Sequence, residues 1–438
     1  MPHLSFAARS AGLFLGAVLV ACSDNPNGPG DPNDTDPPCD ADNGGLTLPA
    51  GFCAVVVAKD LGTARHVAVR PNGDIYVALD NSSGSATDGG ILALRDTDGD
   101  GKADQQQKFG PTGGNGIAWH DGQLFFAPSD RVLRYAFAGD ELVPTGGEVV
   151  VVSGLTAGGD HGRKSVVIDG SNNLYVNFGS ASNSCQQANR EDGSPGMDPC
   201  PELDTRAGIW RFDANATGQT MASGTRFATE LRNMNALAMH PDDGMLYGAQ
   251  NGRDQLLDNW GDLFDAADDA LLPAEELFRI ESGKAYGWPY CYFDAAQNKK
   301  VLAPEYGGNG TEVGRCSERE NPIAVYPAHW APLGMVFYSG EKFPASYRGG
   351  LFIAWHGTRF DPSLQPAGAG YNVTFTGWQG GNPVSPYTVF ADGFAGGNPS
   401  PQGAAHRPVG LTVGPDGCQW VCLIDKTSET RPQSSPRD

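Results

Sequence analysis

The chain carries little charge and few basic residues. Only 18% of its 438 residues are charged, and 30 Lys and Arg stand against 51 Asp and Glu, a formal net charge of −21. So acidic a chain is repelled by phosphate backbones and anionic lipid, which argues against a nucleic-acid partner and against electrostatic binding to a membrane surface. Arginines that gather at one point of such a chain therefore need an explanation.

Several other features are absent. No apolar run reaches the roughly 20 residues of a spanning helix, and the best amphipathic helical pattern is the short segment 262–270. The sequence has no C-x-x-C pair, hence no C-x-x-C-H haem motif, and no G-x-S-x-G. These absences argue against a transmembrane or mainly helical fold, covalently bound haem and a serine hydrolase.

The N-terminus predicts export. Residues 1–21 combine a weak basic region with a short apolar stretch, and Leu19-Val20-Ala21-Cys22 resembles a bacterial lipobox. We therefore expect a lipoprotein signal peptide over 1–21, lipidation of Cys22 and no membrane contact beyond this anchor. Ser23 after the Cys favours the outer membrane, with the protein facing the periplasm or the cell surface. A disordered tether over 22–45, a propeller domain over 46–425 and a loose tail over 426–438 follow from composition.

Cysteine is plentiful for an exported chain. Nine Cys leave eight once Cys22 is lipidated, an even number that predicts disulfides. Cys185 with Cys200 and Cys291 with Cys316 would each close a loop. Bridges among the remaining four would join the two ends of the chain, although Cys418 and Cys422 lie too far apart on one strand to bond each other. These remaining four are Cys39, Cys53, Cys418 and Cys422. Metal binding by the Cys residues is the alternative to disulfides.

A repeated hairpin pattern predicts the fold. Six times, a short apolar run passes through a Gly/Asp/Asn turn into a second apolar run. The chain also holds 60 Gly and 32 Pro, as many short strands and turns require. Hairpins repeated at long intervals predict an all-β, six-bladed β-propeller whose later blades carry inserted loops that shape a binding site. The six copies begin at Arg65, Asn115, Arg163, Met234, Pro332 and Arg407.

Polar residues stand repeatedly at the head of these hairpins. The innermost strands of a propeller line its axis, so residues entering them cluster at one end of the channel. Three Arg at such a point favour a small polyanionic ligand, because guanidinium groups pair with carboxylates in bidentate geometry. Polar residues at a wet channel mouth without a ligand are the alternative. The residues concerned are Arg65, Asn115, His161, Arg232, Asn233 and Arg407.

Motifs spread along the chain carry a family resemblance. They include G-G-D-H-G-R from Gly158, E-L-R-N-M-N-A-L from Glu230, N-G-R-D-Q-L from Asn251, F-I-A-W-H-G-T-R from Phe352 and H-R-P-V-G-L from His406. In this order they resemble the pyrroloquinoline quinone (PQQ)-dependent sugar dehydrogenases of the sorbosone and soluble aldose dehydrogenase type. The resemblance implies a monomeric oxidoreductase that holds PQQ and Ca²⁺ and transfers hydride from an aldose, sorbosone-like sugar or related polyol. Electrons would pass to an external quinone or cytochrome.

The resemblance also implies roles for individual residues. His161 matches the general base, a task suited to imidazole, although a lone His is more often structural. Arg232 and Asn233 match a pair that contacts the quinone oxygens, where Arg232 would stabilise developing charge. Arg407 matches an Arg that binds a cofactor carboxylate, and Arg65 could add a second cation from the first blade. Structural salt bridges are the alternative for both Arg232 and Arg407.

Further cofactor and metal contacts are less direct. Glucose-oxidising members place a Lys near the position of His356, so His356 and Arg359 would supply this contact or lie behind it. Gly252 and Arg253 match a turn whose backbone carbonyls bind calcium, with an ordinary turn as the alternative. A second calcium loop is conceivable at 96–104, but Gln107 stands where a bidentate Glu is needed, which favours a solvated turn.

Two other functions compete with the enzyme. A propeller at the cell surface could bind carbohydrate or protein without catalysis, and the fold alone does not decide between them. A regucalcin-type lactonase would need carboxylates that converge on a metal, whereas the hairpins here begin with Arg, Asn and His.

Overall fold

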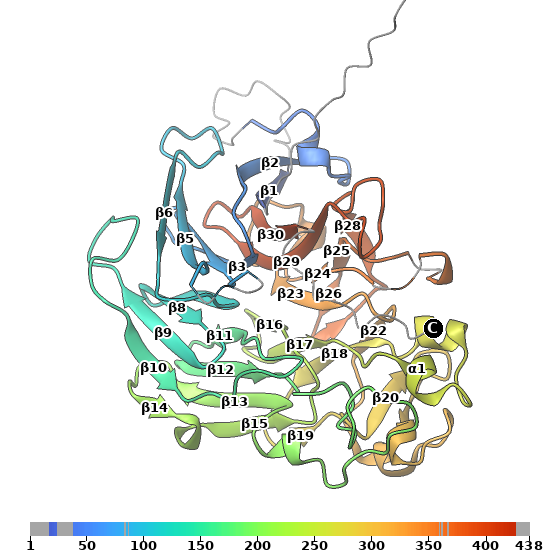
Figure 1. Cartoon of the computed structure of the whole chain (residues 1–438). Coiled ribbons are helices and arrows are strands. Elements are labelled where there is room, and N and C mark those ends of the chain that lie inside the picture. Colours follow the sequence, from blue (N-terminus) through green and yellow to red (C-terminus); the bar gives the residue numbers. More distant parts are fainter. Residues whose placement is uncertain are drawn as a thin grey trace, which may run out of the picture.

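The computed structural model arranges β-sheets around a central axis (Figure 1). It describes residues 17–23, 38–82, 85, 87–358, 360, 362–365 and 368–425, and of 17–23 and 419–425 it describes the backbone alone. Six innermost strands contact one another in a closed ring, in the order β3, β7, β11, β16, β23 and β29. The chain is therefore an all-β propeller, as predicted.

Five blades are built from strands that follow one another along the chain. The first comprises β3 (Ala64–Val69), β4 (Ile75–Leu79), β5 (Gly90–Arg95) and β6 (Gln105–Phe109). The second comprises β7 (Gly116–His120), β8 (Gln123–Ala127), β9 (Arg131–Ala136) and β10 (Val149–Ser153). The third comprises β11 (Val166–Ile168), β12 (Asn173–Phe178), β13 (Gly208–Asp213) and β15 (Thr225–Thr229).

The fourth and fifth blades carry the longer connections. The fourth comprises β16 (Ala236–Met239), β17 (Leu246–Gln250), β18 (Glu275–Ile280) and β22 (Ala324–Tyr326). The fifth comprises β23 (Pro332–Phe337), β24 (Leu351–Trp355), β25 (Val373–Thr376) and β28 (Thr388–Ala391). A small hairpin of β26 (Trp378–Gln379) and β27 (Asn382–Pro383) precedes β28.

The ring closes through a sheet that both ends of the chain share. Its order is β2-β1-β30-β29, formed by β1 (Ala17–Ser23), β2 (Phe52–Lys59), β29 (His406–Val413) and β30 (Gln419–Asp425). The sixth predicted hairpin, β29 with β30, is thus completed by N-terminal strands and is not a blade of consecutive strands. The predicted count of six blades is corrected in this respect to five blades of consecutive strands and one closing sheet.

The second strand of a blade is buried on both faces. Every residue of β4, β17 and β24 is buried. A strand covered on both sides loses polar alternation and reads as a continuous apolar run, which is the pattern that the sequence shows before and after each turn. The turns use glycine where the backbone requires it, as at Gly73 (φ +94°) between β3 and β4.

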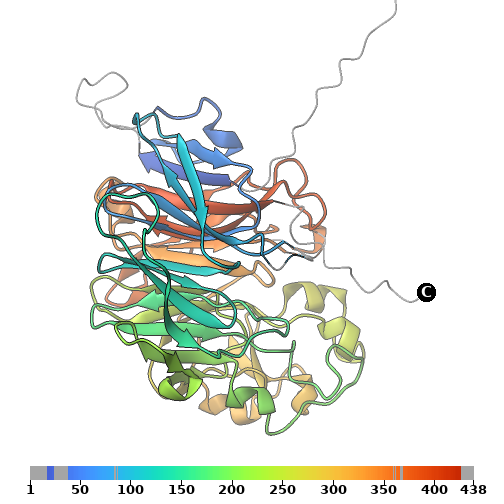
Figure 2. The same cartoon turned by 60° about the vertical axis from the view of Figure 1, so that its left-hand side comes forward.

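Inserted loops pack together at one side of the ring, near α1 and β20 in Figure 1, and protrude there in Figure 2. The β17–β18 connection forms α1 (Leu256–Trp260) and α2 (Ala266–Leu271). The β18–β22 connection forms β19 (Lys284–Ala285), β20 (Cys291–Asp294) and β21 (Lys299–Leu302). The other short elements are β14 (Gln219–Thr220), η1 (Asn43–Gly45), η2 (Pro201–Asp204), η3 (Met221–Ser223), η4 (Pro304–Tyr306), η5 (Gly314–Glu318), η6 (Ala345–Tyr347) and η7 (Pro362–Leu364).

Disulfides fasten these insertions. Cys185–Cys200 and Cys291–Cys316 form as predicted. These four cysteines lie in one apolar cluster with Trp288 and Tyr290. Cys39 bonds to Cys53, so this pair stays within the N-terminal end and does not bridge the two ends, which corrects the prediction for these residues. Cys418 is also disulfide-bonded.

The predicted processing site falls in the closing sheet. Strand β1 (Ala17–Ser23) pairs with both β2 and β30, and Cys22 lies opposite Cys53. Residues 1–16 of the predicted signal peptide, 24–37 of the predicted tether and the tail 426–438 lie outside the described residues. Cleavage before Cys22 and lipidation stay predictions. Among the described residues, no helix is long and apolar enough to cross a membrane.

Candidate active site

A cavity of about 390 Å³ lies at one end of the ring axis. In an antiparallel hairpin the start of one strand and the end of the next meet at the same edge, so residues before β11 and β16 meet residues after β4, β17 and β24 there. The lining is polar and holds both cations and carboxylates. It consists of Arg65, Asp80, Ser129, Gly158, Gly159, Asp160, His161, Gly162, Arg163, Asn233, Asn235, Asn251, Ala331, Leu333 and His356.

His161 is held in a defined tautomer. Its Nδ1 lies 2.9 Å from Oγ of Ser180 and 3.2 Å from the Ser180 carbonyl oxygen. The Ser180 hydroxyl donates its own hydrogen to the carbonyl of Ser182 at 2.7 Å, so Oγ must accept from His161 and Nδ1 carries the proton. Neutral His161 therefore keeps the lone pair on Nε2, for which the described residues provide no hydrogen bond.

The surroundings keep His161 neutral. Burial disfavours the imidazolium form, and the nearby guanidinium of Arg232 adds repulsion, which together hold the pKa of His161 well below its usual 6.5. Asp254 opposes this shift in part, whereas Arg190 adds to it. At neutral pH the ring is thus a proton acceptor at Nε2, as the role of general base requires.

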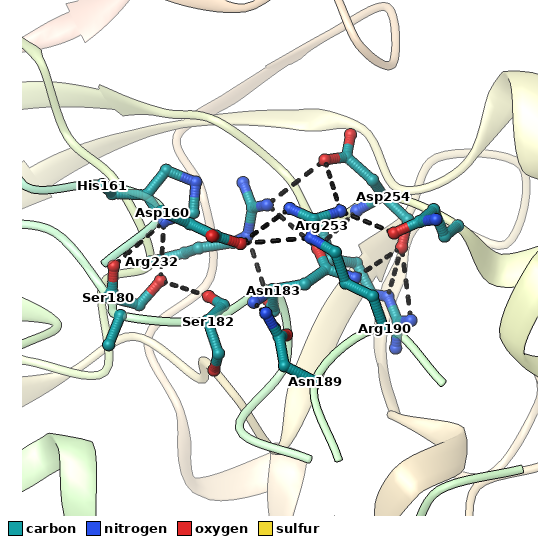
Figure 3. Close-up of polar contacts among 12 residues, drawn as sticks. Asp160, His161, Ser180, Ser182, Asn183, Asn189, Arg190, Arg232, Arg253 and Asp254 are labelled. Atoms are coloured by element: carbon teal, nitrogen blue, oxygen red, sulfur yellow. Dashed lines mark hydrogen bonds and ion pairs between the residues drawn. The ribbon is translucent and has the colours of Figure 1, made fainter. Parts of the chain in front are cut away.

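Arg232 lies beside the cavity as a buried cation and is not part of its lining (Figure 3). Its guanidinium donates to the backbone carbonyl and side chain of Asn183, at 3.0 and 2.9 Å, and to the carbonyl of Gly252 at 2.7 Å. Asp254 is 3.4 Å away. Burial lowers the pKa of Arg232 to about 10, so it stays charged at neutral pH. The predicted contact with quinone oxygens stays a prediction.

Asn233 and Arg65 face the cavity from opposite parts of the chain. The side-chain oxygen of Asn233 is buried and has no hydrogen-bond partner, a costly state that a ligand with a donor or an amide flip toward an acceptor would relieve. Arg65 is almost fully buried, and its Nε donates to Asn115 Oδ1 at 3.0 Å. Asn115 in turn donates to Ser165 Oγ at 3.1 Å, which ties the first three blades together at the cavity.

The other predicted cofactor residues are placed differently. His356 lines the cavity. Arg407 is absent from the lining, because its Nη2 donates to the Pro401 carbonyl at 2.7 Å and its guanidinium lies 5.5 Å from the ring centre of Tyr371. Arg359 lies outside the described residues. The structure therefore assembles part of the predicted set, with Arg407 turned away from the cavity.

The predicted calcium turn is already engaged by the protein. The carbonyl of Gly252 accepts from Arg232, and the backbone N–H of Gly252 donates to Glu275 at 2.7 Å. Arg253 pairs through its side chain with the buried carboxylate of Glu305. Calcium binds six to eight oxygens, whereas here a guanidinium cation faces the Gly252 oxygen. This arrangement does not fit a calcium ion at Gly252 and Arg253.

The acidic loop of the first blade lies in the turn between β5 and β6. In the described part of the chain, the only group of three or more potential metal ligands is Asp96, Asp98 and Asp104, with ligand atoms within 4.8 Å of one another. Asp98 and Asp104 are exposed, and Asp96 accepts from the backbone N–H groups of Gly99 and Gly101. Such contacts are those of a solvated turn, which stays the prediction for this loop, with calcium binding as the alternative.

Several site residues were missed by the motif comparison. Arg163 lines the cavity and donates from Nε to Asp80 Oδ2 at 2.6 Å. Asp160 lines the cavity next to His161, and Arg190 reaches it from the loop between Cys185 and Cys200. Arg163 and Asp160 stand within the G-G-D-H-G-R motif, which could have indicated them. No sequence motif indicated Asp80 or Arg190, because only the folding of their loops brings these residues to the site.

Fold and cavity together define a class: a β-propeller with a polar pocket at the end of its axis, lined by His, Arg and Asp side chains. The chain belongs to the TrAA12-like family, which matches residues 46–430. This confirms the resemblance to PQQ-dependent sugar dehydrogenases. A sequence relative, an uncharacterized protein of Borreliella burgdorferi, is 31% identical over 147 residues, a match spanning 33% of this chain and about a third (32%) of that protein's length.

Solved structures share the fold. The PQQ domain of a pyranose dehydrogenase from Coprinopsis cinerea is 17% identical, with a TM-score of 0.66 and coverage of 90% of this chain and 98% of that one. A Trichoderma reesei enzyme of family AA12, in its calcium structure, is 18% identical, with a TM-score of 0.64 over 89% and 97%. The PQQ-bound aldose sugar dehydrogenase of Streptomyces coelicolor is 15% identical, with a TM-score of 0.50 over 86% and 97%.

Proposed function

We propose that this chain is a quinoprotein oxidoreductase that oxidises an aldose, a sorbosone-like sugar or a related polyol. The observation that carries the proposal is the neutral His161, with its Nε2 lone pair available at a polar cavity that Arg65 and Arg163 help to line. PQQ, when bound, would accept a hydride from the substrate carbon. The family match and the fold of the PQQ-binding neighbours support this reading.

The cavity fits the quinone. A volume of about 390 Å³ is in the range of small-molecule sites. Arg65 and Arg163 offer guanidinium groups for the carboxylates of the cofactor, and the unpartnered amide of Asn233 offers a hydrogen bond. We propose that these residues, with His356, hold PQQ.

The chain's own residues supply the acid–base chemistry. His161 Nε2 would take the proton of the reacting hydroxyl as the C–H bond delivers its hydride, so that the alcohol becomes a carbonyl and both hydrogens are accounted for. The Nδ1–H to Ser180 contact would hold the ring while Nε2 gains the proton. The buried Arg232 keeps imidazolium unfavourable in the resting site, which favours release of that proton afterwards.

Electron transfer and location complete the proposal. We propose that electrons leave to an external quinone or cytochrome, and that the protein is a monomer exported as a lipoprotein anchored at Cys22. The acidic balance of the chain, −21 at pH 7, would favour a basic protein as acceptor.

The decisive experiment is reconstitution. Purified apoprotein is dialysed after addition of PQQ, with and without calcium, and its absorbance and dye reduction are measured with a panel of aldoses and polyols. We expect retained quinone absorbance and turnover with at least one sugar. Neither signal in any condition would reject the enzyme and favour a propeller that binds carbohydrate or protein at the cell surface. Quinone retention without turnover would reject the proposed substrate class.

A further inference from the structure

Arg190 lies in an inserted loop and contacts two other loops of the candidate site, those of Asp160 and Asp254. It lies between the half-cystines Cys185 and Cys200, with a left-handed backbone (φ +65°). Its backbone N–H donates to Gln186 Oε1 at 2.9 Å, which fixes the loop around it. A non-glycine residue in this conformation is uncommon and costs free energy, so the loop must hold it there. The side chain is directed to the rim of the site (Figure 3).

The Arg190 guanidinium contacts two carboxylates from different blades. Its Nε and Nη2 donate to Asp160 Oδ2 at 3.1 and 2.9 Å, and its Nη1 lies 3.6 Å from Asp254 Oδ2. Nη1 also donates to Gln255 Oε1 at 2.6 Å. The planar fork of Arg allows these simultaneous contacts, which a Lys ammonium would reproduce only in part.

Both carboxylates lie next to residues of the proposed mechanism, His161 and Arg232. Asp160 precedes His161 in the loop before β11, and its backbone pairs with the loop after β12. Asp254 lies 3.4 Å from Arg232 Nη2, and the Asp254 backbone N–H donates to Asn183, which also accepts from Arg232. Arg190 thus lies between the loop of the base and the loop of the buried cation.

We propose that Arg190 is a positioning residue, which holds the His161 loop and the Arg232–Asp254 loop in their working arrangement. The role of His161 as base rests on the proposed function, but the contact itself does not. Without Arg190, Asp160 and Asp254 would lose the cation that contacts both of them. Asp160, which lines the cavity, would lose two hydrogen bonds from this guanidinium. The inserted disulfide loop then serves the site by delivering this one side chain.

The test compares R190Q with R190K and with the control R315Q. Arg315 pairs with Asp198 of the same disulfide loop, so R315Q removes an Arg contact to that loop without touching the site. For R190Q we expect kcat/KM to fall on the order of 10- to 100-fold, mainly through kcat, because small displacements of reacting groups are costly. R190K should be intermediate and R315Q unchanged. Circular dichroism and thermal unfolding check that each variant folds.

A second readout is independent of enzyme activity. The pKa of His161 is followed by NMR in the apoprotein. It should rise in R190Q, because the repulsion from a nearby cation is lost. D160N should reproduce most of the R190Q effect on kcat/KM, and the double variant should add little. Titratable or charged groups around His161 besides Arg190 are Arg232, Asp254, Asp160, Asp80, Arg65, Arg163 and His356.

The outcomes are distinguishable. An unchanged His161 titration and an unchanged kcat/KM in R190Q would overturn the positioning role. Loss of activity in R315Q to the same degree would also overturn it, since the loop as a whole would then be responsible. A wild-type protein without any turnover would reject the proposed function, while the His161 titration would still decide the role of Arg190.

Discussion

The two oxygens of Ser180 decide how His161 can act. Because Ser180 Oγ donates to Ser182, the His161 ring must place its hydrogen on Nδ1, and the basic nitrogen is the one that the protein leaves for a substrate. The Ser180 backbone carbonyl, 3.2 Å from Nδ1, can only accept a hydrogen and favours the same tautomer. Ser180 therefore determines which nitrogen of His161 can act as the base.

We expect H161Q to lose turnover by about 10²- to 10⁴-fold, the usual contribution of a general base, with quinone affinity nearly unchanged. The wild-type rate should stay flat from neutral pH to below pH 6.5, because burial and Arg232 hold the pKa of His161 well below that value. The rate should fall only when Nε2 becomes protonated at lower pH. Stopped-flow reduction of the bound quinone across pH measures both. An acid limb centred near pH 6.5 or above would contradict the prediction.

Sequence motifs could predict which residues enter the cavity from strand ends. Arg65, His161, Asn233 and His356 stand at such positions, and hairpin geometry brings them together. Arg407 stands at an equivalent position, but its side chain follows the Pro401 carbonyl and Tyr371 instead. A strand position fixes the backbone of a residue, whereas the rotamer depends on loop contacts that no local pattern encodes.

At the scale of elements, the inserted loops act through their disulfides. Cys185 and Cys200 are 15 residues apart, and closing a loop of this size stabilises a protein by about 3 kcal/mol. The loop between them carries Arg190 to the site. The Cys291–Cys316 loop, in contrast, packs against it without reaching the cavity lining.

Replacing both Cys of one bridge by Ser separates stability from activity. We expect C185S/C200S and C291S/C316S each to lower the free energy of unfolding by about 3 kcal/mol, measured by urea denaturation. Only C185S/C200S should also lower kcat/KM strongly under conditions where both variants are folded. Equal activity in the two double variants would show that the first loop has no part in the site.

Blades were readable from the hairpin repeat, whereas in the insertions only the helical pattern at 262–270 was readable, and it overlaps α2 (Ala266–Leu271). The repeat depends on apolar runs and turn residues that are local. In contrast, α1 and the β20–β21 hairpin are short and gain their stability from apolar clusters within the insertions. The cysteine pairs within the insertions were predictable from spacing, because each closes a short loop. Cys39 and Cys53 are only 14 residues apart, so the same argument from spacing favoured this bridge, whereas the prediction joined these residues to the other end of the chain.

At the scale of the whole molecule, the closing sheet and the predicted processing site share residues. Strand β1 (Ala17–Ser23) lies between β2 and β30, whereas cleavage before Cys22 would leave only its last two residues. We expect the mature protein from membranes to begin with a lipidated Cys22, and the C22S variant to appear in the soluble fraction. Intact-mass measurement of the isolated protein checks this. A mass that includes Ala17–Ala21 would instead establish β1 as a permanent strand of the ring.

Two short strands join neighbouring blades. Strand β14 (Gln219–Thr220), from the third blade's stretch of chain, pairs in parallel with β10 of the second blade, and β19 (Lys284–Ala285), from the fourth blade's stretch, pairs with β15 of the third. The third and fourth blades each contribute an edge strand to the blade before them. None of the second, third and fourth blades can therefore unfold by itself without breaking backbone hydrogen bonds to a neighbour. The half of the ring that carries His161 and Arg232 should therefore unfold as one cooperative block, with slow amide exchange shared across its blades.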